Sequence, residues 1–229
     1  MFIGHFAVGF AAKKINSNPS LGTYFLAAQF LDLLWPTFLL LKIETVRINS
    51  STAGLPLTFT SYPISHSLAL VLVWAALFAI IYYAIRKDIK AAIVLGACVV
   101  SHWLLDLIVH IPDLPLYPGD SPVFGLGLWK SVKGSLIVEI LLFIAGIILY
   151  INATKASNKA GSVGFWALTI FLFVVHLANI FSTPPPSVNA VAWAGQLQWL
   201  LVLWAFWVDR NRYTFDSSIP VTPKIVRAS

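Results

Sequence analysis

Long apolar segments, separated by shorter polar stretches, make up most of this chain. Six of them are long enough to cross a lipid bilayer as helices, which takes about 20 residues each. They are residues 20–41, 62–85, 91–111, 135–151, 163–182 and 189–208. A shorter apolar segment at 2–12 predicts a short or half-inserted helix. The pattern therefore predicts an all-α, polytopic integral membrane bundle of six full spans plus an N-terminal helix that could be counted as a seventh.

Polar connections that contain Gly, Pro and β-branched residues separate these segments. The two longest connections are residues 43–61 and 112–133. Pro36 lies inside the first span, where its missing backbone N–H predicts a kink in the helix. A single transmembrane domain is expected over 1–210, followed by a cytoplasmic, disordered tail at 211–229.

The composition supports the membrane assignment. Hydrophobic residues make up 59% of the chain and charged residues 10%, whereas a soluble domain has about 25% charged residues. The single cysteine, Cys98, excludes an internal disulfide and a cysteine metal cage. The N-terminus is not a typical signal peptide, because Lys13 and Lys14 follow its apolar run instead of preceding it.

The net charge of +6 is explained by orientation in the membrane, and no nucleic-acid partner is expected from it. Alternating spans place eleven of the fifteen basic residues on one side. These are Lys13, Lys14, Arg86, Lys87, Lys90, Lys155, Lys159, Arg210, Arg212, Lys224 and Arg227. The positive-inside rule predicts that this side and the C-terminus are cytoplasmic. The connections 43–61, 112–133 and 182–188 are then expected outside.

Ionisable side chains interrupt the apolar spans at a few positions. In the span 91–111, His102, Asp106 and His110 are four residues apart and therefore lie on one helical face. Two more acids, Asp32 and Glu139, lie within other spans, and no Lys or Arg lies within a span to neutralise the three acids. A charge in hydrocarbon is costly and marks a functional site.

The remaining candidate partners of these acids are the five histidines of the chain. They are His5, His66, His102, His110 and His176. Protons on these imidazoles or a divalent metal could neutralise the acids, and a His/Asp ligand set without fixed cations favours zinc or a similar metal. All of these groups fall in the outer half or at the centre of the membrane, which predicts one cavity open to the exterior.

The spacing suggests how one or two ions would be held. His102 and Asp106 can reach the same ion, and Asp32 and His66 from neighbouring helices could complete four ligands. His5 could bring a second ion against Asp106. Two ions would activate a water molecule and clamp an oxyanion or a phosphoryl oxygen.

The ordered set of these residues resembles the bacterial membrane-bound metal-dependent hydrolases. The matching positions are Gly4-His5, Asp32, His66-Ser67 and Ser101-His102 with Asp106, followed by a proline-rich connection. The resemblance covers residues 1 to about 125, and the family is distantly similar to zinc-dependent phospholipase C and single-strand nucleases. It implies a location in the bacterial cytoplasmic membrane.

The resemblance also implies a ligand set and a general base. The implied metal-site residues are His5, Asp32, His66, His102 and Asp106, with Asp32 as ligand or general base. The family pattern has two acids near the first site and a His-Arg pair before the His-Ser, whereas this chain has FLDLLWP and YPISHS. Such a missing ligand would mean one metal fewer or a lapsed enzyme.

The leading functional hypothesis is a metal-dependent hydrolase with an outward-facing site for a phosphoester or a lipid-like ester. Asp32 and Asp106 are its candidate catalytic residues, and His110, Asp113 and Glu139 could assist. The expected partners are the lipid bilayer and a small-molecule or lipid substrate, and nothing indicates the oligomeric state. A transporter or a proton- or metal-coupled permease could use the same cluster, and a pseudo-enzyme could keep metal for stability alone.

Each residue also has a purely structural interpretation. The pair His102 and Asp106 could lock two helices through a buried hydrogen bond, and His66 could cap its helix. His5 could anchor the chain at the interface, and His110 could be a solvated helix end. Glu139 would be favoured by the helix dipole near an N-terminus. Asp113 follows a proline and could be a turn residue, and His176 could be structural.

Overall fold

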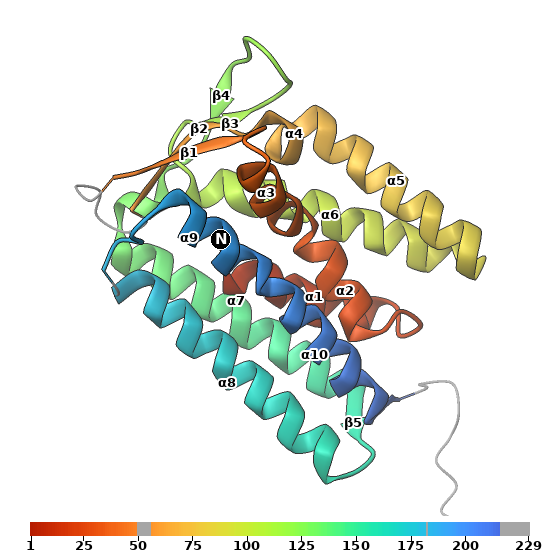
Figure 1. Ribbon diagram of the computed structural model, residues 1–229. Coiled ribbons are helices and arrows are strands. Elements are labelled where there is room, and N and C mark those ends of the chain that lie inside the picture. Colours follow the sequence, from red (N-terminus) through yellow and green to blue (C-terminus); the bar gives the residue numbers. More distant parts are fainter. Residues whose placement is uncertain (50–55, 182, 216–229) are drawn as a thin grey trace, which may run out of the picture.

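The computed structural model describes residues 1–49, 56–181 and 183–215. The chain forms an all-α, polytopic helical bundle, as the hydropathy pattern predicts (Figure 1). In the described part, five continuous helical stretches are long and apolar enough to cross a membrane. They are α5 (Leu68–Arg86), α6 (Ile89–Val109), α7 (Val132–Ala153), α8 (Lys159–Phe181) and the stretch Val188–Arg210, which comprises α9 (Val188–Gln196) and α10 (Gln198–Arg210).

The sixth predicted span is a broken helix. Helices α2 (Leu21–Ala28) and α3 (Phe30–Leu40) meet at Gln29 with a bend of 56°. Pro36 lies inside α3, seven residues after this bend, and the kink predicted there stays a prediction. The carbonyl of Asp32, four residues before Pro36, accepts a long hydrogen bond of 3.5 Å from the Gln198 side chain, which partly replaces the N–H that proline lacks.

The N-terminal helix α1 (Ile3–Ile15) is a central element of the bundle. It packs against α7, α2 and α6, and Ile3, Phe6 and Phe10 on it are fully buried. A Cβ atom at Gly146 of α7 would lie 2.5 Å from the carbonyl oxygen of Ala7, so the two backbones approach closely only because this residue is glycine. The segment is thus a short buried helix surrounded by the spans.

Three short antiparallel hairpins join the helices. They pair β1 (Thr45–Ile48) with β2 (Leu57–Ser61), β3 (Leu114–Pro115) with β4 (Val123–Phe124), and β5 (Thr154–Ala156) with β6 (Arg212–Thr214). The first two hairpins lie together at one end of the bundle, and β5 lies at the opposite end (Figure 1). One-turn helices α4 (Pro63–His66) and η1 (Leu128–Lys130) continue from the connections at the first end.

The predicted tail needs one correction at its start. The sequence places its first residue at 211, whereas Arg212–Thr214 form β6 and the Arg212 guanidinium donates to Thr154. Its guanidinium also lies over the rings of Tyr150 and Phe165. These contacts hold the strand on the bundle, and the predicted tail beyond 215 lies outside the described residues.

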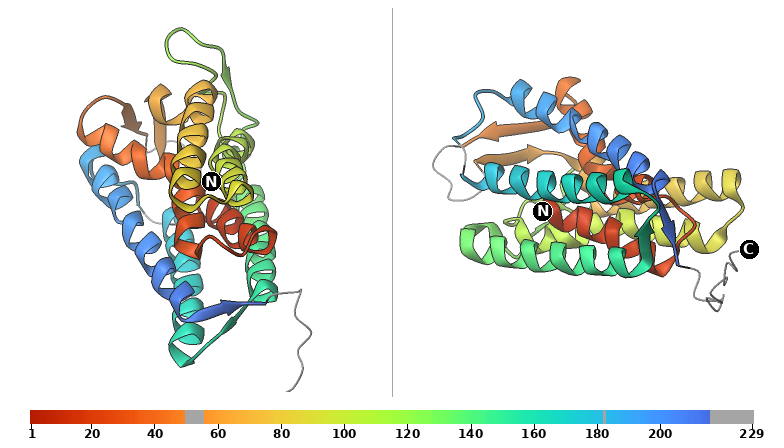
Figure 2. Two further views of the ribbon diagram at one scale, coloured as in Figure 1. Left: turned by 90° about the vertical axis from the view of Figure 1, so that its right-hand side faces the viewer. Right: turned by 90° about the horizontal axis from the view of Figure 1, so that it is seen from below.

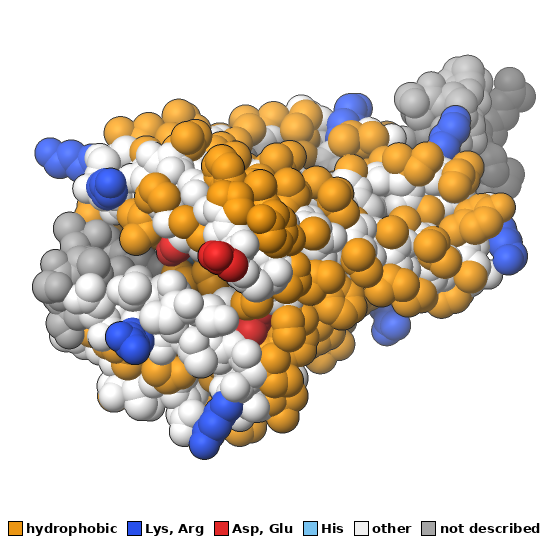
Figure 3. Space-filling model, turned by 90° about the horizontal axis from the view of Figure 1, so that it is seen from above, with side chains coloured by type: hydrophobic (Ala, Val, Ile, Leu, Met, Phe, Trp, Pro, Cys, Tyr) orange, Lys and Arg blue, Asp and Glu red, His pale blue; other side chains and the backbone are white. Residues whose placement is uncertain are grey.

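The surface of the bundle is apolar over most of its length. Leu72, Ile80, Ile81 and Ile85 on α5 are each more than half exposed. Figure 3 shows hydrophobic side chains along the molecule and Lys and Arg mainly toward its two ends. The long helices α5 to α8 run roughly parallel in both views of Figure 2. A surface of this kind matches a lipid environment, so the chain is a membrane protein.

Candidate metal centre

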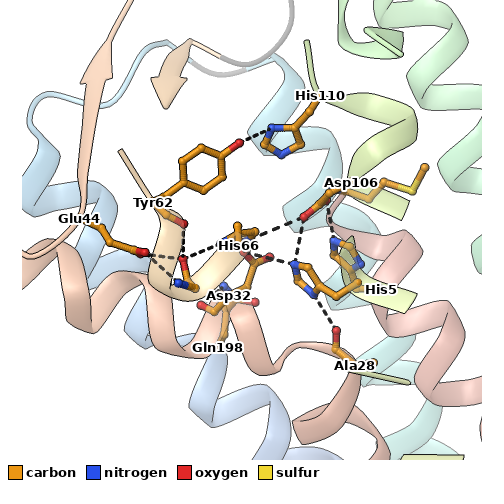
Figure 4. Close-up of polar contacts among 12 residues, drawn as sticks. His5, Ala28, Asp32, Glu44, Tyr62, His66, Asp106, His110 and Gln198 are labelled. Atoms are coloured by element: carbon orange, nitrogen blue, oxygen red, sulfur yellow. Dashed lines mark hydrogen bonds and ion pairs between the residues drawn. The ribbon is translucent and has the colours of Figure 1, made fainter. Parts of the chain in front are cut away.

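Five side chains from four elements converge near one end of the bundle (Figure 4). His5 comes from α1, Asp32 from the first turn of α3, and His66 from the last residue of α4. His102 and Asp106 come from α6, one helical turn apart. The bend at Gln29 starts a new helix just before Asp32, and Pro63 begins the single turn that ends at His66. The structure thus brings together all five residues of the predicted metal set.

The ligand atoms of these residues form two overlapping groups of three. One group contains His66, His102 and Asp106, and the other contains His5, Asp32 and His102; within each group the atoms lie within 4.8 Å of one another. The Nε2 atom of His102 is 3.2 Å from Oδ2 of Asp106 and 3.7 Å from Oδ1 of Asp32. The Nε2 atom of His66 is 3.6 Å from Oδ1 of Asp32 and 3.8 Å from Oδ2 of Asp106.

The hydrogen bond at Nδ1 of His102 determines whether Nε2 of the same ring is a donor or a lone pair. Nδ1 of His102 lies 2.8 Å from the carbonyl oxygen of Ala28, and a carbonyl can only accept, so Nδ1 carries the proton. In the neutral ring, Nε2 is then a lone pair that faces two carboxylates. This buried Nε2 has no hydrogen-bond partner in the described structure. An ion bound by imidazole and carboxylate would satisfy it, so the donor set fits a first-row divalent metal.

Asp106 is the most heavily contacted acid of the cluster. Its Oδ1 lies 3.1 Å from Nε2 of His5 and 2.5 Å from the amino group of Met1. The His5 ring also stacks on His102 with centroids 3.6 Å apart. Among the described residues, no Lys or Arg side chain pairs with Asp32, Asp106 or Glu139. The amino group of Met1 is a cation beside Asp106 that the hydropathy pattern did not predict.

His110 and Asp113 lie beside the cluster but outside both groups. Helix α6 ends at Val109, so His110 leaves the helical face that the spacing predicted for it. Its Nδ1 lies 2.8 Å from Oδ1 of Asp113, and the hydroxyl of Tyr62 donates to the same oxygen at 3.0 Å. Burial, together with the Asp113 carboxylate, raises the pKa of Tyr62, so the phenol stays protonated and can donate.

Glu139 on α7 and His176 on α8 form a second acid–imidazole pair. Oε2 of Glu139 accepts from the backbone N–H of Phe2 at 2.8 Å and lies 3.9 Å from Nδ1 of His176. Both side chains are buried, and Nε2 of His176 has no hydrogen-bond partner in the described structure. His176, for which the sequence left a structural role open, is thus adjacent to a candidate site residue.

A cavity of about 190 Å³ joins these groups. Asp32, His66 and Asp106 line it, as do Glu139 and His176 from the other two helices. Its remaining walls include aromatic side chains from the hairpin end, which are Trp35, Phe59 and Trp129. Figure 3 shows acidic side chains gathered around a hollow toward one end of the visible face. The arrangement can place a small polar group against the cluster while apolar parts contact the aromatic walls.

One buried acid near the cluster had no signal in the sequence pattern. Glu44 follows α3 in the connection 43–61, which the sequence predicts to be a polar loop outside the membrane, and it is 1% exposed. It lies 22 residues from His66, and no helical or strand periodicity relates the two positions. Only the folding of the β1–β2 hairpin places Glu44 against α4.

These features define a class: a polytopic helical membrane protein with a buried His/Asp cluster, able to hold a metal, beside a cavity. No family model, curated protein or solved structure matches the chain. The resemblance to membrane-bound metal-dependent hydrolases therefore stays a hypothesis.

Proposed function

We propose that this protein is a metal-dependent membrane hydrolase that acts on a phosphoester or a lipid-like ester. The observation that carries the proposal is the unpartnered Nε2 of His102, which is buried and faces the carboxylates of Asp32 and Asp106. When the His102 ring is neutral, its Nε2 lone pair and the two carboxylates are all acceptors and cannot satisfy one another, whereas a divalent cation satisfies all three. The adjoining cavity supplies room for a substrate.

The geometry favours one ion per chain. Both ligand groups include His102, and its Nδ1 is engaged by Ala28, so only Nε2 is available. One nitrogen lone pair binds one ion, so the two groups are alternatives for the same ion. Zinc is the expected metal, because neutral imidazole and carboxylate are its common ligands.

The residues around the cavity would divide the work of hydrolysis. A bound ion would lower the pKa of a water molecule and polarise the ester or phosphoryl oxygen. The Asp32 side chain is 24% exposed and lines the cavity, so it can accept the proton of the attacking water. Asp106 is 3% exposed and serves as a ligand. Glu139, and Asp113 through His110, lie where they can assist proton transfer.

The proposed location is the bacterial cytoplasmic membrane, with the hairpin end outside and the C-terminus in the cytoplasm. The basic residues support this orientation, since most of them belong to the connections at the end that carries β5. The cluster lies near the hairpin end (Figure 4). A site at that depth could receive the headgroup of a lipid from the outer leaflet.

Metal content and turnover, measured on the same detergent-purified protein, test the proposal. We expect one zinc ion per wild-type chain and hydrolysis of a phosphodiester or phospholipid substrate. In His102→Ala and Asp106→Asn, both metal and turnover should be lost while a thermal unfolding transition remains. Asp120→Asn is the control, because Asp120 is an exposed acid in the β3–β4 connection and should change neither.

Two results would contradict the proposal. A folded wild-type protein that binds no metal after addition of zinc or manganese would exclude a metal-dependent reaction. Metal-stimulated uptake into liposomes without product formation would instead indicate a transporter that uses the same acids and histidines.

A further inference from the structure

Glu44 is a buried acid outside the cavity that contacts the metal-cluster element α4. It does not line the cavity, and its side chain points toward α4 in Figure 4. A substrate in the cavity would therefore not touch it. Since a buried carboxylate is costly unless it accepts several hydrogen bonds, its partners show what it does.

Three donors surround the Glu44 carboxylate. Oε1 accepts from the backbone N–H of Ile64 at 2.7 Å and from that of Ser65 at 2.8 Å. Oε2 accepts from the Ser65 hydroxyl at 2.6 Å. The first oxygen thus caps the N-terminal turn of α4, and the second is committed to one hydroxyl.

The Ser65 hydroxyl also contacts Nδ1 of His66. The Ser65 Oγ and His66 Nδ1 atoms lie 2.7 Å apart. A hydroxyl has one proton, and the carboxylate of Glu44 can only accept, so that proton lies toward Glu44. Ser65 Oγ must therefore accept the proton of His66 Nδ1. In the neutral ring, Nε2 of His66 is then a lone pair, and this atom faces Asp32 and Asp106.

We propose that Glu44 is a positioning residue that sets the tautomer of His66, through Ser65, for metal binding. The inference rests on the proposed metal-dependent function. His102 reaches the same state by a shorter route, because the Ala28 carbonyl accepts directly from its Nδ1. Both imidazoles then offer Nε2 to the same ion, and Nδ1 of each donates a hydrogen bond to an oxygen acceptor.

The substitution Glu44→Gln reverses this chain of hydrogen bonds without removing the cap. The amide oxygen can take the place of Oε1 and keep the N–H groups of Ile64 and Ser65. The amide NH₂ then donates to Ser65 Oγ, whose own proton turns to Nδ1 of His66. Nε2 becomes protonated and can no longer bind an ion.

The first measurement is the tautomer of His66 in metal-free protein, read from ¹⁵N NMR of ¹⁵N-histidine-labelled chain in detergent. The His66 signals are identified by their loss in His66→Gln. We expect protonated Nδ1 in wild type and protonated Nε2 in Glu44→Gln. The control is Thr45→Val, because Thr45 follows Glu44 directly and its hydroxyl pairs with the exposed Thr60 hydroxyl instead of contacting α4. It should leave the His66 signals unchanged.

The second measurement is zinc affinity by competition with a chelating dye. We expect a loss on the order of 10- to 100-fold in Glu44→Gln, and none in Thr45→Val. Ser65→Ala provides a second variant, because it removes the hydroxyl while the Glu44 cap of α4 remains. It should also weaken zinc binding, and His66 should no longer show a single preferred tautomer.

The outcomes separate this inference from the proposed function. Wild-type zinc affinity in Glu44→Gln, or protonated Nε2 in the wild-type protein, would overturn the role of Glu44 while the metal site stands. A wild-type protein that binds no zinc would overturn both the proposed function and the positioning role, whatever tautomer His66 shows.

Discussion

Single nitrogen and oxygen atoms define the candidate site. His66 and His102 each point Nε2 at Asp32 and Asp106, and each has its Nδ1 held by an oxygen acceptor. Two independent histidines with the same orientation are more than a helix-locking pair requires, since one His–Asp hydrogen bond would suffice for that. The orientation of these two imidazoles thus favours ligand binding over a purely structural role for the cluster.

Residue spacing predicted part of this site. His102 and Asp106 meet the same cluster because four residues complete about one turn of α6. The same spacing was misleading for His110, because α6 ends at Val109 and His110 has an extended backbone, with ψ 146°. Hydropathy does not locate a helix end to one residue. His110, the third residue of the series, therefore lies beyond the helix and contacts Asp113 instead.

Asp88 supports a pH prediction away from the cluster. Its carboxylate accepts from the backbone N–H of Ala91 at 3.0 Å and from the Asn18 side chain at 2.6 Å, which lowers the pKa of Asp88. Its contribution to stability is therefore complete above the ordinary Asp pKa of about 3.9. The contribution is lost as pH falls through the lower pKa of the folded state.

We expect Asp88→Ala to unfold at a lower temperature than wild type at pH 7, with a difference that shrinks toward pH 3. Thermal unfolding in detergent across this range is the measurement. Asp120→Ala is the matched control, since Asp120 is an exposed acid that caps no described helix. Its unfolding temperature should stay close to that of wild type at both pH 7 and pH 3. A difference that grows as the pH falls would contradict the assigned hydrogen bonds.

At the scale of elements, the position of α1 matters most. The helix is too short to cross a membrane by itself, so a hydropathy threshold does not recognise it as a span. It nevertheless carries His5 to the cluster, because α2, α6 and α7 surround it. The close approach of α1 and α7 depends on Gly146, which lies against the backbone of Ala7.

We expect Gly146→Ala to destabilise the bundle by about 1–3 kcal/mol, because its Cβ would meet the backbone of α1, which cannot move aside as a side chain can. The control is Gly96→Ala on α6, whose Cβ would find its nearest neighbour at 3.4 Å. Both changes bring the same gain in helix propensity of about 1 kcal/mol. Chemical denaturation in detergent compares them, and equal stability of the two variants would contradict the tight contact.

The broken span at Gln29 also matters at this scale. A straight helix over 20–41 would continue past Gln29 in one direction, whereas the 56° bend redirects α3. Gln29 itself is fully buried, and both polar atoms of its side chain have no hydrogen-bond partner in the described structure. The sequence signal, a proline at 36, was real but lay seven residues from the bend.

At the scale of the whole molecule, the two ends of the bundle differ. The hairpins β1–β2 and β3–β4 lie toward one end, together with α4, which carries His66, and β5, which pairs with β6, lies at the other (Figure 1). Between them, the interior is packed with aromatic rings, such as Phe10 against Phe25, Tyr150 and Phe165.

The orientation can be tested because Cys98 is the single cysteine and is buried. In a Cys98→Ala background, Asp120→Cys marks the hairpin end and Ser157→Cys marks the opposite end; both positions are exposed. We expect a membrane-impermeant maleimide to label Asp120→Cys in intact bacterial cells and Ser157→Cys only after lysis. The reverse pattern would place the site on the cytoplasmic side.

The sequence by itself determined the membrane class, the helical architecture and the five residues of the cluster. Each of these follows from local information: the length of an apolar run, the chemical type of a residue, or a four-residue spacing. Tertiary structure decided which nitrogen of each histidine faces the acids, where the first span bends, that Glu44 contacts α4, and that the Met1 amino group contacts Asp106. These depend on contacts between positions far apart in the chain, such as Met1 with Asp106, and no periodicity in the sequence relates such positions.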